Sequence, residues 1–205
     1  MYMVNSIFYV IILIMSVVVH EVAHGIVALW YGDQTAKMAG RLTMNPIKHL
    51  DLFGSVLLPL ILVISQAPFL IDWAKPVPYN ERNLSNKKWG TIAVASAGII
   101  ANILLAITFS IVIRVSVAFG FASESLMFIA SAIVFMNIVL AIFNLMPVPP
   151  LDGSKILFAL LPYKYKNIEV FLDKYALIVL LLFIFFVWRL ISPVIFLLFS
   201  LLTGI

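Results

Sequence analysis

Two histidines and a glutamate form a His-Glu-x-x-His pattern in the stretch VVVHEVAHGIVALW, residues 17–30. His20 and His24 are one helical turn apart, so both imidazoles project from one face of a helix, where they can bind one tetrahedral zinc ion. Glu21 lies beside them, positioned to take a proton from a zinc-bound water. This combination of residue types indicates metal-assisted hydrolysis of a peptide bond.

A catalytic zinc needs a third protein ligand and an open fourth position. The sequence has no cysteine, so the third ligand must be a histidine, an aspartate or a glutamate. Asp152 is the leading candidate, because the prolines before it forbid a helix there and Gly153 permits a close approach to the first apolar segment. Asp152 could instead cap a short helix that begins near Ser154. Asp51 and His49 remain rival ligands.

The segments that must position these residues are apolar enough for a lipid bilayer. Of the 205 residues, 64% are hydrophobic and 11% are charged, and the mean hydropathy is +1.15. A soluble domain is nearer about half apolar and about a quarter charged. The composition therefore indicates an α-helical integral membrane protein, which we expect to form a single domain over residues 1–205. No basic patch with interleaved aromatic residues suggests nucleic acid as a partner.

Five apolar runs are long enough to enter a membrane: 6–30, 53–71, 91–117, 125–146 and 175–203. The first, third and fourth runs reach the length of about 20 residues that a full crossing needs. The last run is longer than one crossing and is interrupted by Arg189 and Pro193. We therefore expect about four to five membrane-embedded helices.

The distribution of lysine and arginine predicts the orientation of these helices. Of the 13 Lys and Arg residues, 11 fall in the loops at 31–51, 72–90 and 147–174. The positive-inside rule places all three loops in the cytoplasm and the N-terminus outside the cell membrane, with the active site toward the cytoplasm. Run 53–71 must then enter and leave on one side, so we predict a re-entrant segment there. The alternative is an ordinary span that violates the rule once.

The HEVAH pattern is accompanied by a second frame, N-x-x-P-x-x-x-L-D-G, at residues 144–153. Together they resemble the site-2 protease family of intramembrane zinc metalloproteases. The stretches AGRLTMNPIKHLDLFG and WAKPVPYN are similar to the short bacterial and archaeal branch of that family, without PDZ or CBS domains. The resemblance implies one zinc ion per chain, bound by His20, His24 and Asp152, with Glu21 as the general base.

The same resemblance implies that Asn144 orients the substrate or stabilises the developing oxyanion. From the residues alone, Asn144 could equally form a hydrogen bond between helices. Gly98 and Asn102 match the middle span of the family, whereas Ile99 stands where the family often has proline. We expect close packing at Gly98 and an interhelical hydrogen bond from Asn102.

The resemblance implies cleavage of a transmembrane segment in another membrane protein. Such a substrate must unwind to expose its carbonyls, and β-like extended segments predicted at 39–45 and 74–80, on the cytoplasmic side, could pair with it as strand edges. The alternative is a zinc-binding membrane protein without protease activity, either a transporter or an inactive relative. Glu21 favours the protease, because neither alternative needs a base beside two histidines.

Overall fold

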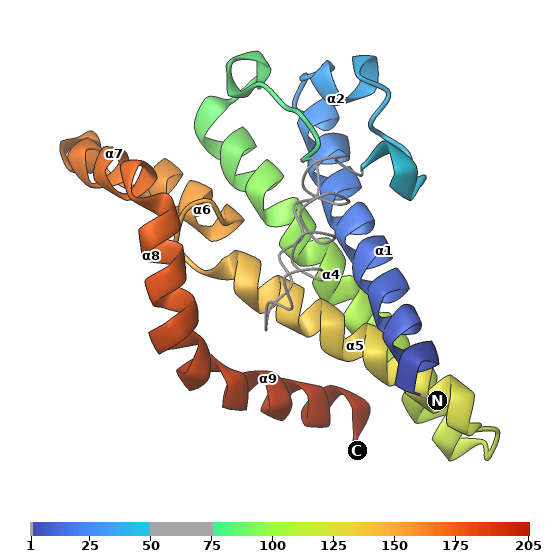
Figure 1. Ribbon diagram of the computed structural model, residues 1–205. Coiled ribbons are helices and arrows are strands. Elements are labelled where there is room, and N and C mark those ends of the chain that lie inside the picture. The colour runs from blue at the N-terminus through green and yellow to red at the C-terminus, as the bar shows by residue number, and fades with distance from the viewer. Residues whose placement is uncertain (1, 50–75) are drawn as a thin grey trace.

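The computed structural model describes residues 2–49 and 76–205, and this part of the chain is helical, without β-strands (Figure 1). Its helices and helical turns are α1 (Tyr2–Trp30), α2 (Thr35–Met38), η1 (Pro46–Lys48), η3 (Glu81–Asn83), α4 (Lys87–Ala118), α5 (Glu124–Leu145), α6 (Asp152–Leu160), η4 (Tyr163–Tyr165), α7 (Lys166–Lys174), α8 (Ala176–Leu182), η5 (Phe183–Val187) and α9 (Trp188–Thr203). The turn η5 is a single π-helical turn between α8 and α9.

Four helical stretches are long and apolar enough to cross a membrane: Ile7–Trp30, Lys87–Ala118, Glu124–Leu145 and Ala176–Thr203. A helix satisfies its own backbone hydrogen bonds, which is why long apolar runs fold as helices in lipid. These stretches coincide with four of the five predicted runs, so the expected class of α-helical membrane protein is confirmed. The re-entrant segment predicted at 53–71 lies outside the described residues.

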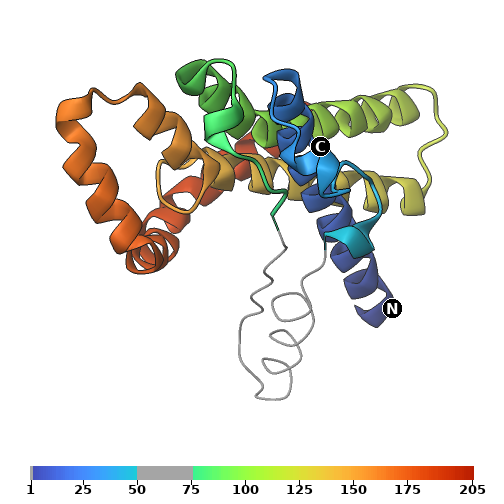
Figure 2. The ribbon, with the colours of Figure 1, turned by 90° about the horizontal axis from the view of Figure 1, so that it is seen from above.

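Helix α4 is the centre of the packing, since it contacts α1, α5, α6 and α9. Figure 1 shows α1, α4 and α5 running alongside one another, and Figure 2 shows α7 and α8 to one side of this group. Where α4 meets α5, the buried residues include Ala106 and Ala130, whose small side chains let the two backbones approach. The helix passes through Ile99 without a break, so the missing proline leaves α4 continuous.

The last span is bent, and Figure 1 shows the chain changing direction sharply between α8 and α9. Helix α9 itself continues through Arg189 and Pro193. Arg114 of α4 donates hydrogen bonds of 2.6 Å to the carbonyls of Leu201 and Leu202. These carbonyls belong to the last turn of α9, where carbonyl groups have no donors within their own helix. Arg114 therefore fastens the end of α9 to α4.

The segments predicted to be β-like form turns and irregular backbone at 39–45 and at 76–80, the described part of 74–80. The second segment is anchored to Asp33, whose carboxylate accepts hydrogen bonds from the Asn80 N–H at 2.7 Å and the Asn83 amide at 2.9 Å. Burial raises the pKa of Asp33, but the hydrogen bonds that its carboxylate accepts outweigh burial and lower that pKa below its ordinary value. Asp33 thus ties the chain after α1 to the segment before α4.

Candidate metal centre

The site forms where a face of α1 meets a face of α4. Each helix contributes three positions spaced four residues apart: Ser16, His20 and His24 on α1, and Val94, Gly98 and Asn102 on α4. This spacing places the three residues of each helix in one row along its surface. All six are buried, so every polar group among them needs a partner inside the protein.

Gly98 lets the His20 ring lie directly against α4. A Cβ atom at position 98 would lie 2.5 Å from Cε1 of His20 and 2.6 Å from each of its ring nitrogens. No side chain larger than hydrogen fits there without moving the ring. The close packing expected at Gly98 is therefore present, and its partner, His20, is one of the three predicted metal ligands.

Hydrogen-bond acceptors on α4 determine which ring nitrogen of each histidine carries its proton. Nδ1 of His24 lies 2.6 Å from the carbonyl oxygen of Val94. A carbonyl can only accept, so Nδ1 carries the hydrogen and the lone pair of the neutral ring is on Nε2. Nδ1 of His20 lies 2.9 Å from Oδ1 of Asn102.

A chain of amide hydrogen bonds fixes the direction of that second contact. Asn137 on α5 donates from Nδ2 to the Ile133 carbonyl and to Oγ of Ser16, both at 2.9 Å. Its Oδ1 therefore accepts from Nδ2 of Asn102, at 3.1 Å. This leaves Oδ1 of Asn102 facing His20, so His20 also donates from Nδ1 and has its lone pair on Nε2.

The two Nε2 atoms and one carboxylate oxygen converge on a common point. The two Nε2 atoms are 3.0 Å apart, and each is 3.0 Å from Oδ2 of Asp152. With both histidines donating from Nδ1, three lone pairs face one another in a buried space, and they repel unless a cation lies among them. Two imidazoles and a carboxylate are ligands that zinc accepts, so the residues fit a zinc ion.

Asp152 reaches this point because the chain turns back tightly after α5. Helix α5 ends at Leu145, and α6 begins at Asp152 itself, with Leu151 at the N-cap position. A Cβ atom at Gly153 would collide with the carbonyl oxygens of Leu145 and Met146, so glycine is needed for this turn. Because α6 begins at Asp152 and Leu151 occupies the N-cap position, the alternative that Asp152 caps a helix beginning near Ser154 is wrong.

The other carboxylate oxygen of Asp152 contacts Lys155, whose Nζ lies 3.0 Å from Oδ1. Burial raises the pKa of the Asp152 carboxyl, and the positive charge of Lys155 lowers it. Burial lowers the pKa of Lys155, and the charge of Asp152 more than compensates. Lys155 therefore carries its positive charge at neutral pH and forms an ion pair with Asp152.

Glu21, the predicted base, is held by the irregular segment 76–80. Its Oε2 accepts a hydrogen bond of 2.8 Å from the backbone N–H of Val77, which is buried. Val77 lies between Pro76 and Pro78, which have no backbone N–H. The Val77 N–H is therefore the one backbone hydrogen-bond donor of residues 76–78. Because it is bonded to Glu21, it is not available to pair with a substrate strand.

Asn144 makes a different contact from the two that the sequence suggested. Its Nδ2 donates to the Leu140 carbonyl at 3.0 Å, within α5 itself. Asn102, as expected, and Asn137 instead form hydrogen bonds between helices. A role for Asn144 toward the substrate stays a prediction.

The structure separates His49 from the metal ligands. His49 is buried, and its Nε2 donates to the Thr43 carbonyl at 2.8 Å. Among the described residues, the group that could hold a metal ion consists of His20, His24 and Asp152. Asp51 lies outside the described residues.

Sequence reasoning missed three contributors to this site: Asn137, Lys155 and Val77. An asparagine inside the apolar run 125–146 signals a hydrogen bond between helices, but not its partner. Lys155 follows Asp152 by three residues, which places both on one face of a helix. No sequence signal marks the backbone N–H of Val77.

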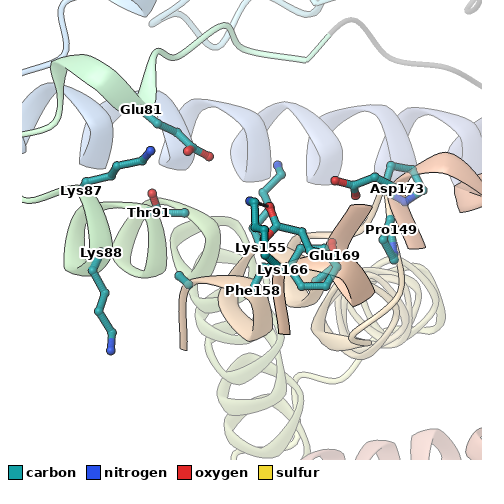
Figure 3. Close-up of a pocket in the computed structure, with 13 residues that line it drawn as sticks. Glu81, Lys87, Lys88, Thr91, Pro149, Lys155, Phe158, Lys166, Glu169 and Asp173 are labelled. Carbon is teal, nitrogen blue, oxygen red and sulfur yellow. Dashed lines mark hydrogen bonds and ion pairs between the residues drawn. The ribbon is translucent and has the colours of Figure 1, made fainter. Parts of the chain in front are cut away.

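A cavity of about 600 Å³ lies beside α6, between the first turns of α4, the prolines before α6, and α7. Figure 3 shows Lys155 near the middle of its lining, with Glu81 and Lys87 toward one end and Asp173 toward the other. The lining combines lysines and acidic residues with apolar groups. Lys155, which lines the cavity, also contacts the carboxylate of Asp152.

Comparison with known proteins decides the family. The sequence profile of Peptidase family M50 matches residues 8–126 and 115–187. The chain belongs to peptidase family M50. This is the site-2 protease family, so the resemblance is confirmed and the protein is a metalloprotease.

Two curated relatives of this M50 metalloprotease support the assignment. "Putative zinc metalloprotease YwhC" of Bacillus subtilis (strain 168) is 39% identical over 177 residues, which cover 84% of this chain and 77% of that protein. "Putative zinc metalloprotease Rip2" of Mycolicibacterium smegmatis (strain ATCC 700084 / mc(2)155) is 27% identical over 141 residues, 68% of this chain and 52% of that protein. No solved structure matches the chain.

Proposed function

We propose that this M50 metalloprotease hydrolyses a peptide bond within or near a transmembrane segment of another membrane protein. The observation that carries the proposal is the convergence of His20 Nε2, His24 Nε2 and Asp152 Oδ2, each 3.0 Å from the other two. These ligands are buried between helices that are long and apolar enough to span a membrane. A site in that position acts on substrates that are themselves in the bilayer.

The three ligands would hold one zinc ion per chain and leave a fourth position open. Zinc supplies a Lewis acid for the peptide carbonyl and lowers the pKa of water at the open position to about 7. Glu21 takes the proton from the attacking water and delivers it to the leaving nitrogen as the C–N bond breaks. The Val77 N–H holds the Glu21 carboxylate in place for this transfer. Asn144 would orient the substrate or stabilise the oxyanion.

Water and an unwound substrate must both reach a buried site. The cavity beside α6 supports a polar route, because it is lined by Lys155, Ser154 and Thr91 on the side of the site where Asp152 lies. A transmembrane substrate hides its carbonyls in helical hydrogen bonds, so it must unwind before it can be cleaved. Pairing of the unwound segment with irregular chain such as residues 39–45 stays a proposal.

The orientation of the protein follows from its charge. Most lysines and arginines fall in the loops at 31–51, 72–90 and 147–174, so we place these loops and the active site toward the cytoplasm, and the N-terminus outside the cell membrane. The partners in this proposal are the lipid bilayer and a transmembrane protein substrate, with no nucleic acid involved.

The test measures zinc per chain and cleavage of a model transmembrane substrate for protein purified in detergent. Glu21→Gln is expected to keep zinc and lose cleavage, because it removes the base and leaves the ligands. Asp152→Ala is expected to lose both. Glu124→Gln, at the start of α5 and outside the site, is the matched control and should behave as wild type. A wild-type protein that binds zinc but cleaves no better than Glu21→Gln would overturn the proposal in favour of a transporter or a binding protein.

A further inference from the structure

The two oxygens of Asp152 have different partners. Oδ2 lies 3.0 Å from Nε2 of each histidine, whereas Oδ1 lies 3.0 Å from Nζ of Lys155. The carboxylate is buried, so neither oxygen has free access to water. The orientation of the carboxylate, and with it the oxygen presented to a metal, is therefore set by protein contacts.

Lys155 is itself held from two sides. It lies three residues after Asp152 on α6, a spacing that brings the two side chains together on one helix face. Its Nζ also lies 5.6 Å from the centre of the Tyr79 ring, in a cation–π contact. Tyr79 belongs to the segment 76–80, from which Val77 holds Glu21. Lys155 thus joins the element that carries the third ligand to the element that orients the base.

The position of Lys155 has consequences for a metal bound by the three ligands. A carboxylate can bind a metal through one oxygen or both, and a catalytic zinc site must keep one coordination position open. An ammonium group on Oδ1 competes with binding through both oxygens.

We infer that Lys155 is a positioning residue, which holds Asp152 as a one-oxygen ligand and so keeps the fourth position of the metal open. The inference rests on the proposed function. Some residues hydrogen-bond to a metal ligand without binding the metal themselves. Removing such a residue typically lowers metal affinity or activity by about 10–100-fold.

The first measurement is zinc affinity, by competition with a chelator, for protein purified in detergent. Lys155→Met keeps a flexible chain but removes the ammonium that fixes the orientation of the Asp152 carboxylate, so zinc binding should weaken by about 10–100-fold. Lys155→Arg keeps the positive charge and should bind zinc more tightly than Lys155→Met. If Lys155→Met does not fold, Lys155→Gln, which is neutral and polar, replaces it.

Lys166→Met is the matched control. Lys166 lines the same cavity and pairs with Glu169 at the same three-residue spacing, but Glu169 is not a metal ligand. Lys166→Met should therefore bind zinc as the wild type does. An equal loss in Lys166→Met and Lys155→Met would overturn the inference, as would wild-type affinity in Lys155→Met or equal losses in Lys155→Met and Lys155→Arg.

The second measurement is the visible absorption spectrum of the cobalt-substituted protein, which responds to the number of ligands around the metal. The wild type should show the intense bands of a four-coordinate site. In Lys155→Met, the bands should weaken because Oδ1 becomes free to bind as well. Identical spectra would overturn the inference while leaving the proposed function intact. A wild-type protein that retains neither zinc nor cobalt would overturn the proposed function, and this inference with it.

Discussion

Replacing Gly98 by alanine is expected to remove metal from the site while leaving α4 folded. The new Cβ atom would lie 2.5 Å from the nearest atom of the His20 ring, and ordinary van der Waals contact begins at 3.4 Å, so the ring must retreat by about 0.9 Å. The tolerance of a metal–ligand distance is only about 0.2 Å. If the His20 ring moves by that distance, it cannot keep both its hydrogen bond from Nδ1 to Asn102 and the position of Nε2 at the metal site.

The expected loss of zinc affinity is at least about 100-fold, or roughly 2.8 kcal/mol, the upper end for disturbing a metal's supporting contacts. The effect on the helix has the opposite sign, because alanine is about 1 kcal/mol more favourable than glycine inside a helix. The signature is therefore weak zinc binding in a protein that remains folded. Chelator competition measures the affinity, and thermal unfolding in detergent without zinc measures the fold.

Gly90→Ala is the matched control, since Gly90 also lies in α4. Its added Cβ would meet Leu84 and Tyr31 side chains at 3.1–3.2 Å, a milder contact away from the metal ligands. Gly90→Ala should bind zinc as the wild type does. Wild-type zinc affinity in Gly98→Ala would refute the reasoning, because it would mean that the His20 ring is not held against Gly98 when metal is bound.

Three further predictions test the contacts around the site. Asn102→Ala removes the acceptor from Nδ1 of His20, so zinc affinity in the chelator assay should fall by about 10–100-fold; an unchanged affinity would contradict the assigned hydrogen-bond chain. Val77→Pro removes the N–H that Glu21 accepts, so cleavage should fall by about 10–100-fold with zinc content unchanged, and wild-type cleavage would show that the base needs no such support. Asp33→Asn should lower the free energy of unfolding by about 1–3 kcal/mol at neutral pH. The folded-state pKa of Asp33 is lowered, so this difference is fully present above the unfolded value of about 3.9 and disappears as the pH falls through the folded value. Denaturant titrations at several pH values measure it, and a difference that grows on acidification would contradict the assignment.

The sequence predicted the parts of this protein that depend on local patterns. Apolar runs of sufficient length predicted about four to five membrane-embedded helices, and four candidate spans are present among the described residues. Burial in lipid leaves a long apolar segment little alternative to a helix. The one-turn spacing of His20 and His24 predicted two imidazoles on one face. The prolines before Asp152 predicted the break that brings this carboxylate back to α1, and the structure places it there.

The contacts that support the ligands could not be predicted, because they join segments far apart in the chain. Asn137 reaches Ser16 on α1 and Asn102 on α4, and an isolated asparagine in an apolar run does not reveal its partners. Val77 contributes a backbone N–H, which every residue except proline carries. The side chain of Asn144 turns back to its own helix, and this choice between a local and a distant acceptor depends on packing.

The most direct test of the central claim is X-ray absorption spectroscopy at the zinc edge, on protein loaded with one zinc per chain. We expect a four-coordinate zinc with two imidazole nitrogens at about 2.0–2.1 Å and oxygen ligands at about 2.0–2.2 Å. His24→Ala, which lacks one of the three ligands, should lose zinc, as Asp152→Ala does. A zinc site without two imidazoles, or wild-type zinc binding in His24→Ala, would contradict the assignment of His20, His24 and Asp152 as the metal centre.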